Sequence, residues 1–311
     1  MKKYLTLFAA VILILAAAVI PAETYAENTP KTIPFPEYYL NECPKCGTVQ
    51  TLSLSGVRDI CVYTPYGYDE AEQYDVVLLL HGSGGDITDW ITKSQNVFSR
   101  RDCFGISGRK LYDWMIYEGK IKPVIIASID NNYRNTYKEL ETDVNNVIKA
   151  IVDNFSTFAP SFSDENITNA RKHFTIGGLS MGSMFLMRYM LDYPDFFGNY
   201  LLISGYSNIA GFQKELAEIE NKPEKVFIGC GVDDWFIMYA RRINEFMPQC
   251  SDDVELVEYA YGHNWRTWFS SIYDSLIYLY GTDNAHGDFQ SGAKSIIKRI
   301  CGTYGATLIS Q

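Results

Sequence analysis

The chain has 311 residues, of which 47% are hydrophobic and 21% are charged, a composition typical of a folded globular protein and not of a disordered one. Its formal net charge of −10 excludes the class of proteins that bind nucleic acid through a large basic surface. A chain of this length can bury a core that is stable without a metal or disulfides, and it fits one α/β domain.

The N-terminus has the layout of an export signal. Two lysines precede an apolar run at residues 5–20, and a small-residue cleavage site ends at Ala26. This pattern predicts a signal peptide over residues 1–26 and a secreted, extracellular protein with no stable membrane association after cleavage. The apolar run is slightly long, so an uncleaved membrane anchor is the alternative. Residues 27–50 are rich in Pro, Asn and Thr and are interpreted as an N-terminal leader segment.

After the leader, short apolar runs alternate with segments of helical periodicity, which predicts βαβ units and a mostly parallel sheet. The predicted strands are Arg58–Tyr63, Asp75–Leu80, Val124–Ile129, Phe174–Gly177, Tyr200–Ile203, Val226–Ile228 and Val254–Tyr259. The predicted helices are Glu139–Phe155, Met181–Leu191, Trp235–Met247 and Trp265–Tyr280. We therefore expect one catalytic domain over 51–281, followed by a C-terminal extension, 282–311, packed on the same domain. Residues 99–120 are a candidate cover for the site, and 291–301 a candidate helix.

The seven cysteines allow some pairing in an oxidising compartment, and their odd number leaves at least one thiol unpaired. Cys43 and Cys46 have the spacing of half a zinc knuckle. A structural zinc site needs four ligands, and no second such pair follows in the sequence. No metal and no organic cofactor are therefore expected.

The residues Gly178-Leu-Ser180-Met-Gly182 match the pattern G-x-S-x-G between a predicted strand and a predicted helix. In this context the serine lies on a sharp turn that projects its hydroxyl above the sheet. The helix that begins behind it favours developing negative charge. The motif predicts Ser180 as a catalytic nucleophile.

A serine hydroxyl is a weak nucleophile, so it needs a histidine base that a carboxylate orients. His263 follows the last predicted strand and precedes a helix, whereas His286 lies beyond the final helix, where a surface loop is expected. His263 is therefore predicted as the base. Asp233 and Asp234 follow the strand before it, and their positions alone leave both open as the acid, with the other capping the next helix.

Hydrolysis of an ester also needs two backbone N–H donors to stabilise the oxyanion of the tetrahedral intermediate. One is expected from Met181, the residue after the nucleophile, and the other from the loop that begins at His81 and follows the strand Asp75–Leu80. Gly82 and Gly84 allow this loop to approach the substrate closely, and His81 is expected to support it by hydrogen bonding.

These motifs together resemble the esterase D-like branch of the α/β hydrolases, particularly the feruloyl and acetyl-xylan esterases of carbohydrate esterase family 1. The resemblance covers about residues 45–280 and is carried by residues 62–65, 67–68, 79–86, 176–182, 230–234 and 262–265, with Trp90. It implies the α/β-hydrolase fold, a mostly parallel central sheet flanked by helices on both faces. It also implies that Asp234 is the acid and that Ser83 is the second oxyanion donor.

The predicted function is a secreted serine esterase that removes feruloyl or acetyl groups from acylated xylan or an oligosaccharide of the plant cell wall. Trp90 and Trp265 are candidates for contact with substrate. Export argues against a glutathione-thioester hydrolase, a cytosolic activity of the same branch. Two alternatives stay open: an acyltransferase on the same scaffold, which would use the same residues, and a non-catalytic carbohydrate-binding relative, which would have no need of them.

Overall fold

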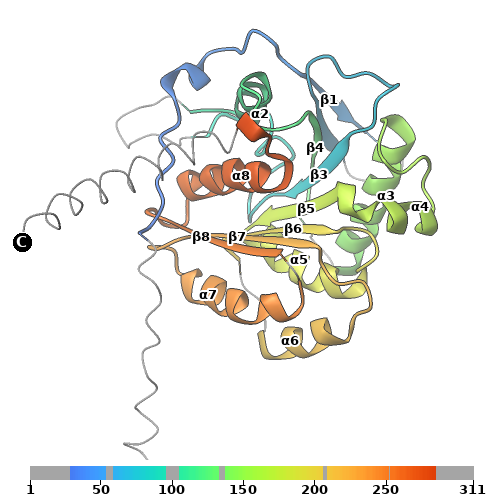
Figure 1. Cartoon of the computed structure of the whole chain (residues 1–311), viewed down its shortest axis with the longest axis vertical. Coiled ribbons are helices and arrows are strands. Elements are labelled where there is room, and N and C mark those ends of the chain that lie inside the picture. The colour runs from blue at the N-terminus through green and yellow to red at the C-terminus, as the bar shows by residue number, and fades with distance from the viewer. Residues whose placement is uncertain are drawn as a thin grey trace, which may run out of the picture. The chain divides into compact units, whose positions relative to one another are not determined.

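The computed structural model describes residues 29–53, 59–95, 105–132, 137–205, 209–251 and 253–284. Within these residues, eight strands form one sheet in the order β1-β2-β4-β3-β5-β6-β7-β8 (Figure 1). The first two strands pair antiparallel, as do β2 and β4, and all later pairs are parallel. The strands are β1 (Thr48–Leu52), β2 (Ile60–Thr64), β3 (Asp75–Leu80), β4 (Val124–Ile129), β5 (Phe174–Leu179), β6 (Asn199–Ile203), β7 (Lys225–Gly231) and β8 (Asp253–Tyr259).

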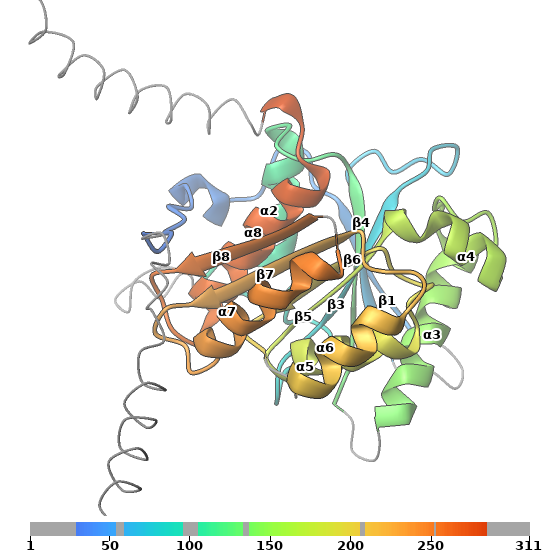
Figure 2. The same cartoon turned by 60° about the horizontal axis from the view of Figure 1, so that its bottom comes forward.

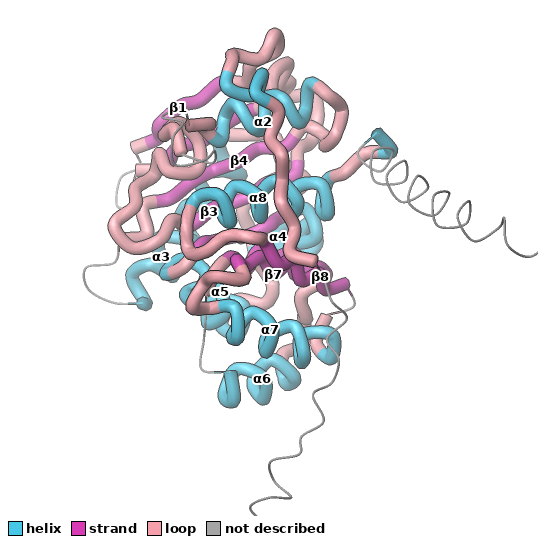
Figure 3. Tube along the Cα trace, turned by 90° about the vertical axis from the view of Figure 1, so that its left-hand side faces the viewer, coloured by secondary structure: helices cyan, strands magenta, loops and turns pink. Residues whose placement is uncertain are grey.

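Helices cover both faces of the sheet, with α2 and α8 on one face and α3, α5, α6 and α7 on the other (Figures 1 and 2). At the β8 edge, α8 lies on one side of the strand and α7 on the other (Figure 3). The α-helices are α2 (Gly108–Tyr117), α3 (Tyr137–Asn154), α4 (Asp164–Ala170), α5 (Met181–Asp192), α6 (Ile209–Glu218), α7 (Ile237–Phe246) and α8 (Trp265–Tyr280). Single 3₁₀ turns are η1 (Glu37–Leu40), η2 (Arg171–His173) and η3 (Met247–Gln249).

Strand β3 shows why its sequence is continuously apolar. Val76, Leu78 and Leu80 pack into the core under α3 and α5, whereas Val77 and Leu79 pack into the core under α2 and α8. Because successive side chains of a strand point to opposite faces, a strand covered on both faces has no polar side. This arrangement confirms the predicted fold class.

The predicted strands and helices all occur, with ends shifted by a few residues. The sequence patterns missed β1, α2, α4 and α6. Residues 105–120 of the candidate cover are not a lid, because α2 packs in the core, where Leu111 and Tyr112 are fully buried. Part of the expected leader also belongs to the fold, since Tyr39 is fully buried and β1 begins within it.

Several expectations fall outside the described residues: the signal peptide over 1–26, His286, the candidate helix at 291–301 and all of the C-terminal extension after 284. In the part of the chain that the structure describes, none of the helices combines the length and apolar character that a membrane span requires.

Candidate active site

Ser180 lies at the turn between β5 and α5, where the backbone takes an unusual conformation. Its φ of 49° and ψ of −115° place a non-glycine residue in a strained region, and such strain is typical of functional turns. The turn is tight because α5 starts directly against β3: a Cβ atom on Gly182 would lie 2.8 Å from the Leu80 carbonyl oxygen. Close packing therefore requires the second glycine of the G-x-S-x-G pattern.

His263 and Asp234 come from the loops that follow β8 and β7. Parallel strands end at the same sheet edge, so these loops meet the Ser180 turn. His263 Nε2 lies 3.1 Å from Ser180 Oγ, and His263 Nδ1 lies 2.9 Å from Asp234 Oδ2. An ionised carboxylate only accepts hydrogen bonds, so Nδ1 carries the proton and Nε2 accepts from the serine hydroxyl. The structure thus brings these three predicted residues together.

Asp234 is buried and accepts a second hydrogen bond, from the Phe236 amide at 2.9 Å. Burial alone would raise the pKa of its carboxyl group, but the hydrogen bonds from His263 and Phe236 outweigh burial and hold that pKa below its ordinary value. Asp233, by contrast, is exposed. Asp234 also accepts the hydrogen bond from the turn before α7. The capping role expected for the aspartate that is not the acid is therefore not observed for Asp233.

The two predicted oxyanion donors belong to the loop after β3 and to the first turn of α5. Met181 is the first residue of α5, and the first N–H groups of a helix have no partner within it. Ser83 lies inside a turn closed by the bond from Gly85 N to Gly82 O (3.1 Å), which leaves the Ser83 amide outside that bond. Gly84 has a φ of 76°, a conformation that favours glycine.

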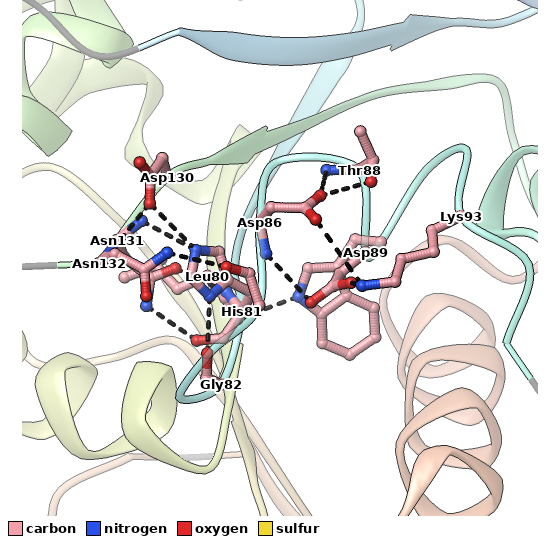
Figure 4. Close-up of polar contacts among 12 residues, drawn as sticks. Leu80, His81, Gly82, Asp86, Thr88, Asp89, Lys93, Asp130, Asn131 and Asn132 are labelled. Atoms are coloured by element: carbon pink, nitrogen blue, oxygen red, sulfur yellow. Dashed lines mark hydrogen bonds and ion pairs between the residues drawn. The ribbon is translucent and has the colours of Figure 1, made fainter.

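A buried polar network holds this loop, and its central residue, Asn131, was not predicted from the sequence (Figure 4). Asn131 Oδ1 accepts from the His81 amide at 2.7 Å, and its Nδ2 donates to the His81 carbonyl at 2.8 Å. The Asn131 backbone N–H donates to His81 Nε2, so Nε2 is the acceptor nitrogen of this ring. Nδ1 therefore carries the proton and donates to the Gly82 carbonyl at 2.7 Å. These bonds tie His81 to the loop and to the segment after β4, and Asn132 adds a bond to the Gly85 carbonyl.

A signal for Asn131 exists in the sequence. Asp130, Asn131 and Asn132 directly follow β4, whose end lies at the same edge as those of β3 and β5. Polar residues at the carboxyl ends of parallel strands are where sites are built. Without the strand order, however, nothing in the sequence indicates that this end of β4 faces His81.

A second missed group, Asp89 and Lys93, lies farther along the same loop (Figure 4). The nearly buried Asp89 carboxylate accepts from Lys93 Nζ at 2.6 Å and from the Asp86 amide at 3.2 Å. Both Asp89 and Lys93 line the pocket above Ser180. The loop is thus stiffened at its start by an asparagine and at its end by an ion pair.

The pocket above Ser180 has a volume of about 610 Å³. Aromatic rings form the wall around His263: the ring centroids of Trp235, Trp268 and Phe236 lie 4.4, 5.0 and 5.4 Å from that of the imidazole. The lining residues are Gly82, Ser83, Gly84, Gly85, Asp89, Lys93, Gln95, Leu179, Ser180, Trp235, His263, Asn264, Trp265 and Trp268.

The two tryptophan candidates for substrate contact have different positions. Trp265 lines the pocket. Trp90 is fully buried, its indole N–H donates to the Leu80 carbonyl at 3.0 Å, and its ring packs against Trp265. The expectation for Trp90 is therefore wrong: Trp90 supports the wall from behind and does not reach the pocket.

Among the described residues, no group of three or more His, Cys, Asp and Glu side chains is arranged to hold a metal ion. Five cysteines fall in the described ranges, and all five are free thiols: Cys43, Cys46, Cys61, Cys230 and Cys250.

Two curated relatives are each 29% identical to the chain over 55% of its length: endo-1,4-beta-xylanase Y of Acetivibrio thermocellus, over 180 residues, and an endo-1,4-beta-xylanase/feruloyl esterase of Xylanibacter ruminicola, over 185 residues. The matched part spans only 15% and 22% of those larger proteins.

A mutant of the feruloyl esterase module from Clostridium thermocellum, solved in complex with sinapinate, has the same fold. Its TM-score to this structure is 0.65 at 22% identity, covering 80% of this chain and 93% of the module. The family model described as "Putative esterase" matches residues 52–279, nearly the whole of the described sheet and its helices. The chain therefore belongs to the esterase family and has the α/β-hydrolase fold that the sequence predicted.

Proposed function

We propose that this protein is a serine esterase that hydrolyses feruloyl or acetyl esters on plant cell-wall polysaccharide. The observation that carries the proposal is the chain of two hydrogen bonds from Ser180 through His263 to Asp234, with distances of 3.1 and 2.9 Å. A general base within this distance of a hydroxyl can take its proton as the hydroxyl attacks.

In the proposed reaction, Ser180 Oγ attacks the ester carbonyl carbon and gives its proton to His263 Nε2. The carbonyl oxygen becomes an oxyanion, which the amides of Ser83 and Met181 stabilise. The carbon–oxygen bond to the alcohol then breaks, and the alcohol leaves with the proton from His263. Water attacks the acyl-enzyme in the same way, releases the acid and restores Ser180. Asp234 stays ionised throughout and stabilises the imidazolium.

Three observations support a polysaccharide ester as the substrate. The curated relatives are named as xylanases, and one of them also as a feruloyl esterase. The pocket has an aromatic wall suited to a phenolic ring or to the apolar face of a sugar. The N-terminal pattern of the sequence is that of exported proteins, and plant polysaccharide lies outside the cell. We accordingly propose that residues 1–26 are removed on export and that the mature protein is extracellular.

The test is a panel of three esters: methyl ferulate, acetylated xylan and a chromogenic acetate. The proposal predicts release of ferulate or acetate by the wild type, with a fall in kcat of about 10⁴-fold or more for Ser180→Ala. Equal activity of the two proteins on all three esters would refute the proposed nucleophile. Added alcohol acceptors distinguish hydrolysis from transfer, because an acyltransferase forms a new ester with the acceptor in place of free acid.

A further inference from the structure

An exposed apolar strip lies beside the pocket. Trp235, Met238 and Tyr239 are 67%, 66% and 41% exposed, and they make up half of the six large hydrophobic side chains that are exposed in the described part of the chain. Met238 and Tyr239 lie in the first turn of α7, three and four residues after Trp235, which lies in the turn that leads into this helix. We call these three residues the ledge. Exposed apolar groups clustered in this way mark an interaction surface.

The ledge begins at the imidazole. The Trp235 ring lies over the His263 ring, with centroids 4.4 Å apart and planes at 30°, and Trp235 also lines the pocket. In ester hydrolysis by a serine enzyme, the imidazole that accepts the serine proton returns it to the departing alcohol. The alcohol oxygen must therefore come within hydrogen-bond distance of His263 Nε2. Whatever is attached to that oxygen therefore lies near the rings around His263, of which Trp235 is the exposed one.

The other substituents of the ester carbon have different surroundings. The carbonyl oxygen points to the amides of Ser83 and Met181, on the side of the loop after β3. The acyl group then occupies the part of the pocket that the half-buried Trp265 lines. This division leaves the ledge, which extends from Trp235 in the pocket lining to Met238 and Tyr239 beyond it, for the alcohol.

We propose that the ledge binds the sugar chain that forms the alcohol part of the ester. This inference rests on the proposed function. A sugar ring offers an apolar C–H face to an aromatic side chain and hydroxyl groups at its edge. The ledge has matching chemistry, because the face of α7 that carries it continues to Arg242, three residues after Tyr239, and Arg242 pairs with Glu245 at 2.5 Å. A lipid chain, by contrast, has no polar group that could form a hydrogen bond with this ion pair.

The test compares two substrates that share the feruloyl group and differ in the alcohol: methyl ferulate and feruloylated arabinoxylan oligosaccharide. The variant is Met238→Ser/Tyr239→Ser, because Trp235 lines the pocket whereas neither of these two residues does. We expect kcat/KM for the oligosaccharide to fall at least about fivefold and that for methyl ferulate to change by less than about twofold. The matched control is Tyr117→Ser, which removes a 48% exposed tyrosine from the distant helix α2 and should affect neither substrate.

Equal losses on the two esters, or no loss on either, would overturn the assignment of the ledge. A second measurement keeps this result separate from failure of the proposed function: retardation of Ser180→Ala in a native gel that contains soluble arabinoxylan. Retardation that is lost on adding Met238→Ser/Tyr239→Ser supports the ledge even if the wild type hydrolyses neither ester. Migration that is unaffected by the polysaccharide counts against the ledge whatever the esterase result.

Discussion

The wall of the pocket that follows β3 is held by hydrogen bonds, whereas the wall around His263 is held by ring contacts. On the first wall, Asn131 binds both backbone groups of His81, and Asp89 pairs with Lys93. On the second, Trp235, Phe236 and Trp268 surround the imidazole, and Asp234 is the ionised partner that it contacts.

This difference matches the tasks proposed for the two walls. Oxyanion donors act by being fixed in advance, because a dipole that must reorient during the reaction loses its advantage. A directional network of short hydrogen bonds fixes a backbone amide better than apolar packing does. The imidazole instead exchanges a proton between two oxygens and gains from surroundings that exclude water. Rings supply that exclusion and leave the two ring nitrogens of His263 to Ser180 and Asp234.

The largest effect is expected on the aromatic wall, from His263→Ala. Removing the base should lower kcat by about 10⁵ to 10⁶-fold, because none of the aromatic side chains around it can accept the proton of the Ser180 hydroxyl. The measurement is kcat on methyl ferulate. His173→Ala is the matched control, since His173 pairs with Asp75 before the start of β5, away from the pocket, and should keep activity within about twofold. Comparable losses in the two variants would mean that His263 has no special role.

On the polar wall, Asn131→Ala should lower kcat by about 10²-fold with a smaller change in KM, because the His81 backbone loses both of its side-chain bonds and the adjacent oxyanion amide loses its position. Leaving those buried groups unpaired should also cost about 1–3 kcal/mol of unfolding free energy. Kinetics and urea unfolding measure the two effects. Asn41→Ala, at an exposed position directly after η1, is the control. A loss of stability with unchanged kcat would show that the network does not serve the amide.

A smaller effect is expected from Lys93→Met, which leaves the nearly buried Asp89 carboxylate without its cation. We predict a loss of about 1–3 kcal/mol in unfolding free energy. Adding Asp89→Asn should restore part of it, because an amide does not need a counter-charge. Urea unfolding of the single and double variants makes this comparison. If the loss in the double variant equals the sum of the losses in Lys93→Met and Asp89→Asn alone, the ion pair contributes nothing as a pair.

The smallest effect concerns the pH dependence of the aromatic wall. The pKa of Asp234 lies below its ordinary value of 3.8 in the folded state, so the folded protein binds fewer protons there than the unfolded chain. Its contribution to stability is therefore complete above about pH 5 and disappears as the pH falls through the folded-state pKa. We expect the Tm difference between wild type and Asp234→Asn to shrink between pH 5 and pH 3. A constant difference across this range would mean that the carboxylate charge is not stabilising.

Much of the site follows from local sequence. The strand, tight turn and helix around Ser180 are fixed by an apolar run, by glycines where the backbone is crowded, and by helical periodicity. The placement of His263 between the last strand and α8 follows from the same patterns. Both features can be predicted without knowledge of the fold, because strand and helix periods and glycine requirements are properties of neighbouring residues.

Choices among similar residues depended on packing. Asp233 and Asp234 are adjacent and chemically identical, and only the turn after β7 buries one against His263 and leaves the other exposed. Trp90 and Trp235 are the same residue type, yet one is fully buried and the other is 67% exposed. Asn131 reaches His81 because β4 pairs with β3, 50 residues away in the chain. Strand order and burial come from contacts between distant segments, so the tertiary structure alone decided which of these side chains contribute to the site and which do not.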